Sequence, residues 1–97
     1  MVVDVLAALG EPTRLAIMRL LWEQGERCAC QIIPHLGATQ SRVSRHMQAL
    51  KQAGLVIDRR DAQRVLYRIN PALAPEIEKV LEAVMAADTA QRDRSAA

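Results

Sequence analysis

Aromatic residues and long apolar runs are scarce in this sequence of 97 residues. It contains one tryptophan, one tyrosine and no phenylalanine, so the core must be built from aliphatic side chains. A single small domain with such a core often gains stability by oligomerising, and we expect a homodimer. No apolar run approaches the ~20 residues that cross a bilayer, and no secretory signal is recognisable. We therefore expect a cytoplasmic protein with no membrane partner.

Residue sets that serve catalysis are also missing. The sequence contains no Ser-His-acid set and no glycine-rich phosphate loop. Its only grouped carboxylates, Glu76, Glu78 and Glu82, are expected to face solvent. We therefore do not expect an enzyme.

Positive charge is concentrated in one part of the chain. Residues 1–41 carry three basic and four acidic side chains, residues 42–68 carry seven and two, and residues 71–97 carry three and five. The three segments therefore have net charges of −1, +5 and −2, which make up the formal +2 of the whole chain. A clustered basic segment is typical of proteins that bind a polyanion such as nucleic acid.

Helical signals occupy the first half of the sequence. Apolar spacing, Pro12 as a first helical residue, and Gly25, Gly37 and Gly54 as stops predict four helices. The third and fourth are joined by a tight turn at Gly37, which is typical of a helix-turn-helix. The predicted helices are residues 2–9, a segment from 12 to about 24, residues 29–36, and a segment capped by Thr39 or Ser41 that ends before Gly54.

After Gly54 the apolar period changes from helical to alternating. The runs "LVIDRR" and "RVLYRI" predict two strands joined at Asp61, Ala62 and Gln63, and helical spacing returns in "PEIEKVLEAVMAADT". We therefore predict a mainly α fold with a small β-hairpin, a winged helix-turn-helix in which a fifth helix follows the hairpin. Residues 1–90 would form one DNA-binding and dimerisation domain, and residues 91–97 a disordered tail.

The fourth helix carries the residue types that read DNA. Val43, Met47 and Leu50 form its apolar stripe, and the opposite face is rich in Ser, Arg and Gln without balancing glutamates. An idle basic surface helix is the alternative reading of this face. His46, at the edge of the stripe, is expected to make a structural hydrogen bond rather than a base contact. The predicted DNA-binding set is Gln40, Ser41, Arg42, Ser44, Arg45 and Gln48 on the helix, with Arg59, Arg60 and Arg64 on the hairpin.

The two cysteines, Cys28 and Cys30, flank one alanine at the start of the third helix. In a reducing compartment such a pair indicates a metal-binding, reactive or inert site before it indicates a structural disulfide. Arg27 and the helix N-terminus would favour the thiolate form, and soft thiolates select soft ions. His35 is either a third ligand or an ordinary surface histidine.

Four segments together resemble the ArsR/SmtB family of metal- and metalloid-responsive winged-helix repressors. They are "LGEPTRLAIMRLL", "ERCACQI", "TQSRVSRHMQALKQAGLV" and "RRDAQRVLYRI". The resemblance covers roughly residues 3 to 86. It implies a homodimer held by the first and last helices, a fourth helix that reads double-stranded operator DNA, and an effector that releases the DNA.

The resemblance also implies a role for the cysteines. In arsenic-sensing members a Cys-x-Cys at this place binds trivalent arsenic or antimony, usually with a third cysteine at the position that Ile33 occupies here. Cys28 and Cys30 match the first two positions, so As(III) or Sb(III) is the expected effector. No zinc site is expected, because the family's zinc sensors use histidines and acids on the last helix and residues 71–97 contain no histidine.

Two other functions remain open on the sequence alone. Oxidation could join the two cysteines in a labile disulfide, so the protein could respond to thiol redox state or to persulfides. Alternatively, the winged-helix architecture could serve as a protein-interaction module, whose binding would depend little on salt.

Overall fold

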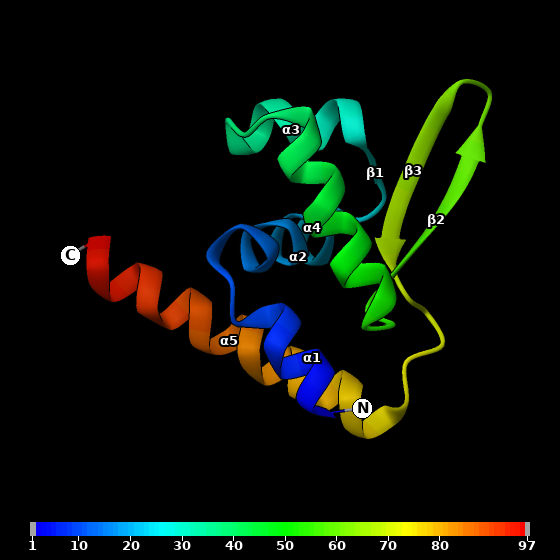
Figure 1. Ribbon diagram of the computed structural model, residues 1–97. Helices are drawn as coiled ribbons and strands as arrows, with labels where there is room; N and C mark the ends of the chain where they lie inside the picture. The colour runs from blue at the N-terminus through cyan, green and yellow to red at the C-terminus, as the bar shows by residue number, and fades with distance from the viewer. Residues whose placement is uncertain (1, 97) are drawn as a thin grey trace.

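The computed structural model describes residues 2–96 and contains five helices and three strands within them (Figure 1). The predicted order of helices and hairpin is confirmed, and one further short strand precedes the third helix. The elements are α1 (Val2–Leu9), α2 (Pro12–Gln24), β1 (Arg27–Cys28), α3 (Ala29–Leu36), α4 (Gln40–Gln52), β2 (Val56–Asp61), β3 (Arg64–Ile69) and α5 (Pro75–Ala96).

Local signals at the helix ends explain these boundaries. The side chain of Glu11 caps α2 by accepting a hydrogen bond of 2.9 Å from the backbone N–H of Arg14. Thr39 caps α4 in the same way, through a 3.3 Å bond from the N–H of Arg42. Gly37 ends α3 with φ 66°, in the left-handed region that favours glycine, and so permits the tight turn into α4.

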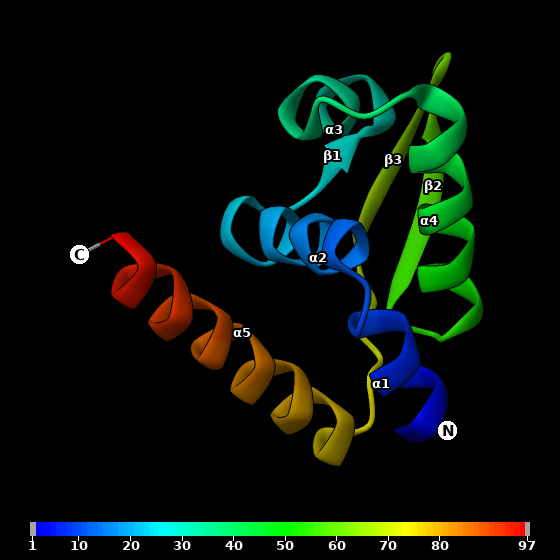
Figure 2. The same ribbon diagram turned by 60° about the vertical axis from the view of Figure 1, so that its left-hand side comes forward.

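The core is aliphatic and α2 lies at its centre. Figures 1 and 2 show α2 between the α1–α5 layer on one side and α3, α4 and the sheet on the other. The largest fully buried side chains come from every layer: Ile17, Met18, Ile32, Met47, Leu50, Leu55 and Leu81. Since no phenylalanine is available, methionine and leucine fill the space between the layers.

The sheet has three antiparallel strands in the order β1-β3-β2. Strands β2 and β3 pair along their whole length, from Val56 with Ile69 to Asp61 with Arg64, and form the predicted hairpin. The unpredicted strand β1 pairs Cys28 with Leu66 on the other edge of β3. A strand of two residues is too short to show any alternation, so only its pairing with β3 defines it.

Helix α5 continues to Ala96, through the residues from 91 onward for which the sequence predicts a disordered tail. Residues 91–96 contain Gln, Arg and Ala, which favour helix, and no Gly or Pro that would end it. Ala97 lies outside the described residues. In Figures 1 and 2 the C-terminal half of α5 extends beyond the rest of the molecule.

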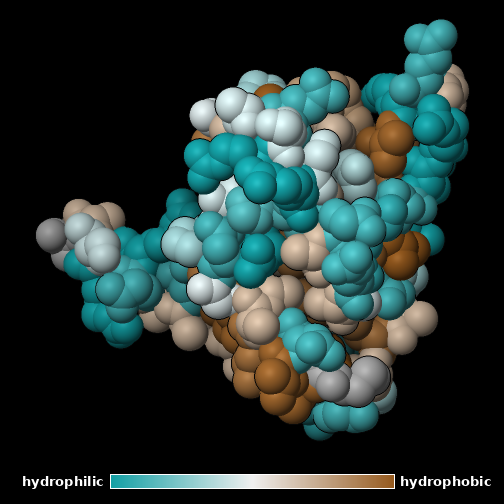
Figure 3. Space-filling view, viewed as in Figure 1, coloured by the Kyte–Doolittle hydropathy of each residue, from teal (hydrophilic) through white to brown (hydrophobic). Residues whose placement is uncertain are grey.

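The two ends of the molecule differ in surface chemistry. Figure 3 shows hydrophobic surface over α1 and mainly hydrophilic surface over α3, α4 and the hairpin. The large exposed apolar side chains of α1 are Val2, Val3 and Leu6, which are 45%, 72% and 51% exposed. Among residues 2–96, none of the helices combines the length and hydropathy needed to cross a membrane.

Candidate nucleic-acid interface and cysteine pair

Helix α4 separates a buried stripe from a polar face as predicted. Val43, Met47 and Leu50 are at most 1% exposed and hold the helix against the core. The six predicted contact residues of this helix are all exposed: Gln40, Ser41, Arg42, Ser44, Arg45 and Gln48. The structure therefore presents these side chains on one side of a helix that follows a tight turn.

The guanidinium groups of Arg42 and Arg45 make no ion pair or hydrogen bond within residues 2–96. Helix α4 contains no acidic residue that could neutralise them. Their charge is therefore available to an external anion, such as a DNA phosphate or the acceptor edge of a guanine.

The hairpin β2–β3, which we call the wing, uses its three predicted arginines differently. Arg59 makes a two-pronged ion pair with Glu26, through distances of 2.9 Å from Nε to Oε2 and 2.8 Å from Nη2 to Oε1. Arg64 donates a 3.3 Å bond to Asp61, whereas Arg60 makes no such contact among the described residues. All three side chains are exposed, but only Arg60 has its full charge uncommitted.

The pairing of Glu26 with Arg59 changes the titration of both groups. The hydrogen bond from Arg59 lowers the pKa of Glu26, and the same bond raises the pKa of Arg59. Sequence reasoning missed Glu26 because the two partners lie 33 positions apart. The contact attaches the wing to the segment that leads into β1.

Two further contacts fix the orientation of α4. At its end, Lys51 makes a 2.7 Å ion pair with Asp58 of β2, and this bond raises the pKa of Lys51. At its middle, His46 Nδ1 lies 3.4 Å from Nη1 of Arg14 and 3.6 Å from Oε2 of Glu11. His46 therefore has the expected structural contacts beneath the helix.

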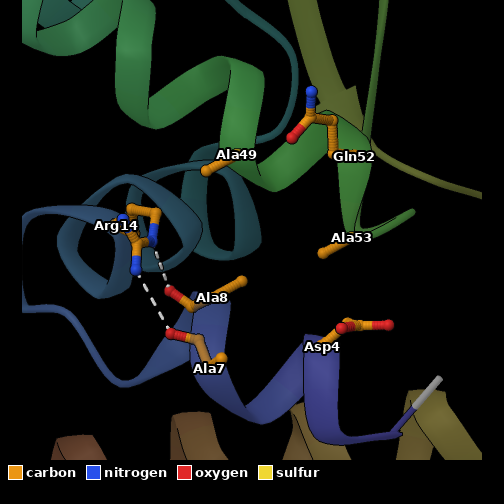
Figure 4. Close-up of a pocket in the computed structure, with 7 residues that line it drawn as sticks. All are labelled: Asp4, Ala7, Ala8, Arg14, Ala49, Gln52 and Ala53. Carbon is orange, nitrogen blue, oxygen red and sulfur yellow. Dashed lines mark hydrogen bonds between the residues drawn. The ribbon is translucent and has the colours of Figure 1, made fainter.

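Arg14 connects α4 to α1. Its Nε donates a 2.7 Å bond to the carbonyl oxygen of Ala8 and its Nη2 a 3.2 Å bond to that of Ala7, so it caps the end of α1 (Figure 4). In the same view Ala49 of α4 faces this part of α1 across a hollow of about 270 Å³. One arginine thus holds the C-terminus of α1 and, through His46, helix α4.

Cys28 and Cys30 are joined in a disulfide, with their Cα atoms 5.2 Å apart. Cys28 is 1% exposed and forms the N-cap of α3, where its backbone N–H donates a 3.0 Å bond to Oε1 of Gln31. Cys30 is exposed at the surface. Only one sulfur of the pair is therefore open to solvent, and the other faces the interior.

Two residues near the cysteine pair in the sequence, Arg27 and His35, are its expected charged neighbour and its candidate third ligand. Arg27 donates its hydrogen bonds to the carbonyl oxygen of Glu26 at 2.7 Å and to Oε1 of Gln24 at 3.2 Å. His35 is exposed. Within residues 2–96, His, Cys, Asp and Glu side chains nowhere form a group of three or more that could hold a metal ion.

Cys28 and Cys30 lie where β1 meets α3, and α3 contacts both α4 and strand β3 of the wing. Helix α3 packs against α4 and α2, and also against β1 and β3 (Figure 2). Cys28 pairs with Leu66, which on its other side pairs with Arg59. A helix-turn-helix followed by a basic hairpin defines a DNA-binding winged-helix protein, here with a two-cysteine site in the segment that packs against α4 and β3.

Comparison with known proteins places the chain in a family. The model described as "Bacterial regulatory protein, arsR family" matches residues 11–58. The arsenic resistance transcriptional regulator ArsR2 of Pseudomonas putida is 34% identical over 86 residues, covering 89% of this chain and 75% of that protein. The arsenical resistance operon repressor of Escherichia coli is 34% identical over 80 residues, covering 82% and 68%. The chain belongs to the arsR family of bacterial transcriptional regulators.

Solved structures support the same assignment. A homodimeric winged helix-turn-helix DNA-binding domain from Mycobacterium bovis matches with a TM-score of 0.76 and 34% identity, over 91% of this chain and 78% of that one. HlyU from Vibrio cholerae matches with a TM-score of 0.75 and 29% identity, over 86% of each chain. Winged-helix regulators of this family bind DNA and are not enzymes.

Proposed function

We propose that this protein is a homodimeric transcriptional repressor that releases its operator when As(III) or Sb(III) binds Cys28 and Cys30. The observation that carries the proposal is the position of the cysteine pair at the junction of β1 and α3, since β1 pairs with β3 of the wing and α3 packs against α4. The similarity to arsenic-resistance regulators supports a metalloid as the effector.

Operator binding would use α4 in the major groove and the wing along the backbone. The free charges of Arg42, Arg45 and Arg60 support this arrangement. A dimer formed through the apolar face of α1 and through α5 would place its two reading helices about one helical turn, ~34 Å, apart. Both helices must then fit successive grooves at once, so a small distortion in either subunit weakens the complex.

Effector binding could change DNA affinity by two routes. The first runs from α3 through the Gly37 turn into α4, and Pro34 weakens α3 on this route because it removes one backbone hydrogen bond. The second runs from Cys28 across β3 to β2, with the Glu26–Arg59 pair as a clamp. A coupling of ~1–3 kcal/mol, or about 5- to 150-fold in operator affinity, is enough for regulation.

The test is operator release by the reduced protein, with Ala29→Ser as a matched control between the two thiols. A duplex selected from a random pool by the wild type serves as the operator in a fluorescence anisotropy titration. Cys28→Ser and Cys30→Ser should bind the duplex as the wild type does and keep it in arsenite or antimonite. Release that persists in both variants would place the effector site elsewhere and refute the proposal.

The disulfide between Cys28 and Cys30 supports a second candidate, a repressor whose operator affinity depends on thiol oxidation. Oxidation by a diazene would change operator affinity in the wild type and in Ala29→Ser but not in the Cys→Ser variants. A phosphine reductant separates the two functions. Release of the operator by arsenite requires reduced thiols, whereas release of the operator by oxidation cannot occur while the thiols are kept reduced. Equal operator affinity of the reduced and oxidised wild type would exclude this second function.

A further inference from the structure

The cysteine pair can offer a trivalent arsenic centre only two sulfur ligands. The chain has two cysteines, and residues 2–96 hold no cluster of three His, Cys, Asp or Glu side chains suited to an ion. A partner subunit joined through α1 and α5 cannot supply a third thiol, because α3 lies at the opposite end of the molecule from those helices (Figures 1 and 2). One valence of a bound arsenic atom must therefore be filled by something other than this protein.

The number of exchangeable groups on the arsenic compound then becomes decisive. Arsenous acid, As(OH)3, has three hydroxyl groups, and two thiols displace two of them and leave one As–OH bond. A monosubstituted compound, R–As(OH)2, has only two. In either case each thiol gives its proton to a departing hydroxyl, two S–As bonds form, two water molecules leave and arsenic stays trivalent. For R–As(OH)2 alone, the two thiols satisfy every exchangeable valence.

The residue beside the site suits an organic substituent. Ile33 lies three positions after Cys30 on α3, on the same side of the helix, where the resembling arsenic sensors usually place their third cysteine. Its side chain is half-buried and packs against the core, so part of an apolar surface remains accessible next to the exposed Cys30. A third thiolate ligand is thus replaced by a hydrophobic contact.

We propose that the cysteine pair, with Ile33, selects monosubstituted organic trivalent arsenicals over inorganic arsenite. This inference rests on the proposed function, because it names the chemical class of the effector at the same site. Cys28 and Cys30 supply the two sulfurs, Cys28 from the interior and Cys30 from the surface. Ile33 supplies the apolar contact for the organic group.

The test compares phenylarsine oxide with sodium arsenite on the full-length protein reduced with a phosphine. Native mass spectrometry should show one phenylarsenic group per subunit, without an additional thiol ligand, and none on Cys28→Ser or Cys30→Ser. Release of the selected duplex should need about tenfold less phenylarsine oxide than arsenite, a difference equal to ~1.4 kcal/mol, which ~55 Å² of buried apolar surface provides.

Two variants of one residue make the test sharper. Ile33→Cys should build a three-thiol site and reverse the preference, so that arsenite becomes the more potent of the two compounds. Ile33→Ala should keep both sulfurs and reduce the preference for phenylarsine oxide to within about threefold, since most of the apolar contact is lost. Circular dichroism and operator affinity without effector establish that each variant is folded.

The outcomes separate this inference from the proposed function. If arsenite releases the duplex from the wild type at the same or a lower concentration than phenylarsine oxide, the inference is overturned and the proposed function stands. A preference unchanged in both Ile33 variants overturns it as well. If neither compound binds the reduced wild type, the inference and the proposed metalloid response both fail.

Discussion

Helices α2 and α4 have the same length, 13 residues, and each carries two arginines, but the two helices use them in opposite ways. Arg14 and Arg19 of α2 contact groups of the same chain, namely the carbonyl oxygens at the end of α1 and the carboxylates of Glu23 and Asp88. Arg42 and Arg45 of α4 have no such partners within residues 2–96. The arginines of α2 therefore hold this fold together, whereas those of α4 keep their charge for an external anion.

The largest expected effect comes from breaking the DNA-facing half of this comparison. Arg45→Ala should weaken operator binding by about 5- to 150-fold, or ~1–3 kcal/mol, since a base-edge or phosphate contact is lost. The unfolding temperature should stay unchanged because Arg45 is exposed and makes no ion pair or side-chain hydrogen bond within residues 2–96. Anisotropy titrations over a range of salt concentrations measure the effect, with Arg92→Ala on α5 as the control. Unchanged affinity would remove Arg45 from the reading face.

The second prediction concerns Arg14 of α2, whose partners lie within the same chain. Arg14→Ala should lower the free energy of unfolding by about 2 kcal/mol, because two backbone carbonyls at the end of α1 lose charged donors. For a domain of this size that corresponds to a fall of ~10 °C in the unfolding temperature, which calorimetry measures. Arg14→Lys keeps the positive charge but loses the planar set of donors. Its free energy of unfolding should lie between those of the wild type and Arg14→Ala. Wild-type stability of Arg14→Ala would show that the cap on α1 is dispensable.

Arg19 tests the same idea at a smaller scale. Its Nη1 lies 2.9 Å from Oδ2 of Asp88, and the two side chains are 13% and 20% exposed. Replacing either partner with alanine should cost about 1 kcal/mol, and the double variant should cost little more than one replacement. Chemical denaturation of the three variants measures the coupling. Additive losses would mean that the ion pair does not fasten α5 to α2.

Acid pH should weaken the structural contacts. Glu11 is partly buried, which opposes ionisation, but hydrogen bonds from the N–H groups of Arg14 and Thr13 outweigh this and lower its pKa. The hydrogen bond from Arg59 lowers the pKa of Glu26. Both carboxylates therefore stabilise the fold at pH values above their ordinary pKa of 4.5. That stabilisation is lost as the pH falls through their lowered pKa values.

Denaturation at a series of pH values tests this for Glu11. Glu11→Gln should be less stable than the wild type at neutral pH, and the gap should close at acid pH as the wild-type carboxyl becomes protonated. A constant gap across the series would mean that the charge of Glu11 contributes nothing beyond its shape.

The smallest expected effect concerns Arg59, which is exposed on the wing like Arg60 but has an internal partner, Glu26. Glu26→Gln removes the carboxylate that holds it, so its charge becomes available to a DNA phosphate. We expect operator binding to tighten by about two- to threefold, with the salt slope steeper by about one unit. The wild-type and Glu23→Gln proteins are the controls. Weaker operator binding by Glu26→Gln would instead show that the clamp is needed to place the wing.

Several parts of the fold could be read from the sequence because short-range signals determine them. The caps of α2 and α4, the glycine that ends α3 and the alternation in β2 and β3 each depend on residues close together in the chain. The polar face of α4 follows from helical spacing alone. For the same reason all nine predicted DNA-binding residues could be named as exposed polar groups before any tertiary contact was known.

The contacts that the sequence did not predict join distant positions. Arg19 and Asp88 are 69 residues apart, Arg59 and Glu26 are 33 apart, and Arg14 and His46 are 32 apart. Side chains of the same type look alike in the sequence, whatever partner they meet. The helical continuation of α5 past residue 91 was not predicted, because polar composition was taken as disorder although four of residues 91–96 are Gln, Arg or Ala, which favour helix.

The sequence by itself determined the order of the helices and the hairpin, the apolar stripes that build the core, the basic face of α4 and the presence of only two thiols. Each of these depends on periodicity or on composition, which are properties of the chain alone. Only the tertiary structure decided which arginines are free and which sulfur is buried. It also decided that β1, with Cys28, forms one edge of the sheet and that β2, with Arg59, forms the other. Only packing brings such remote segments within bonding distance.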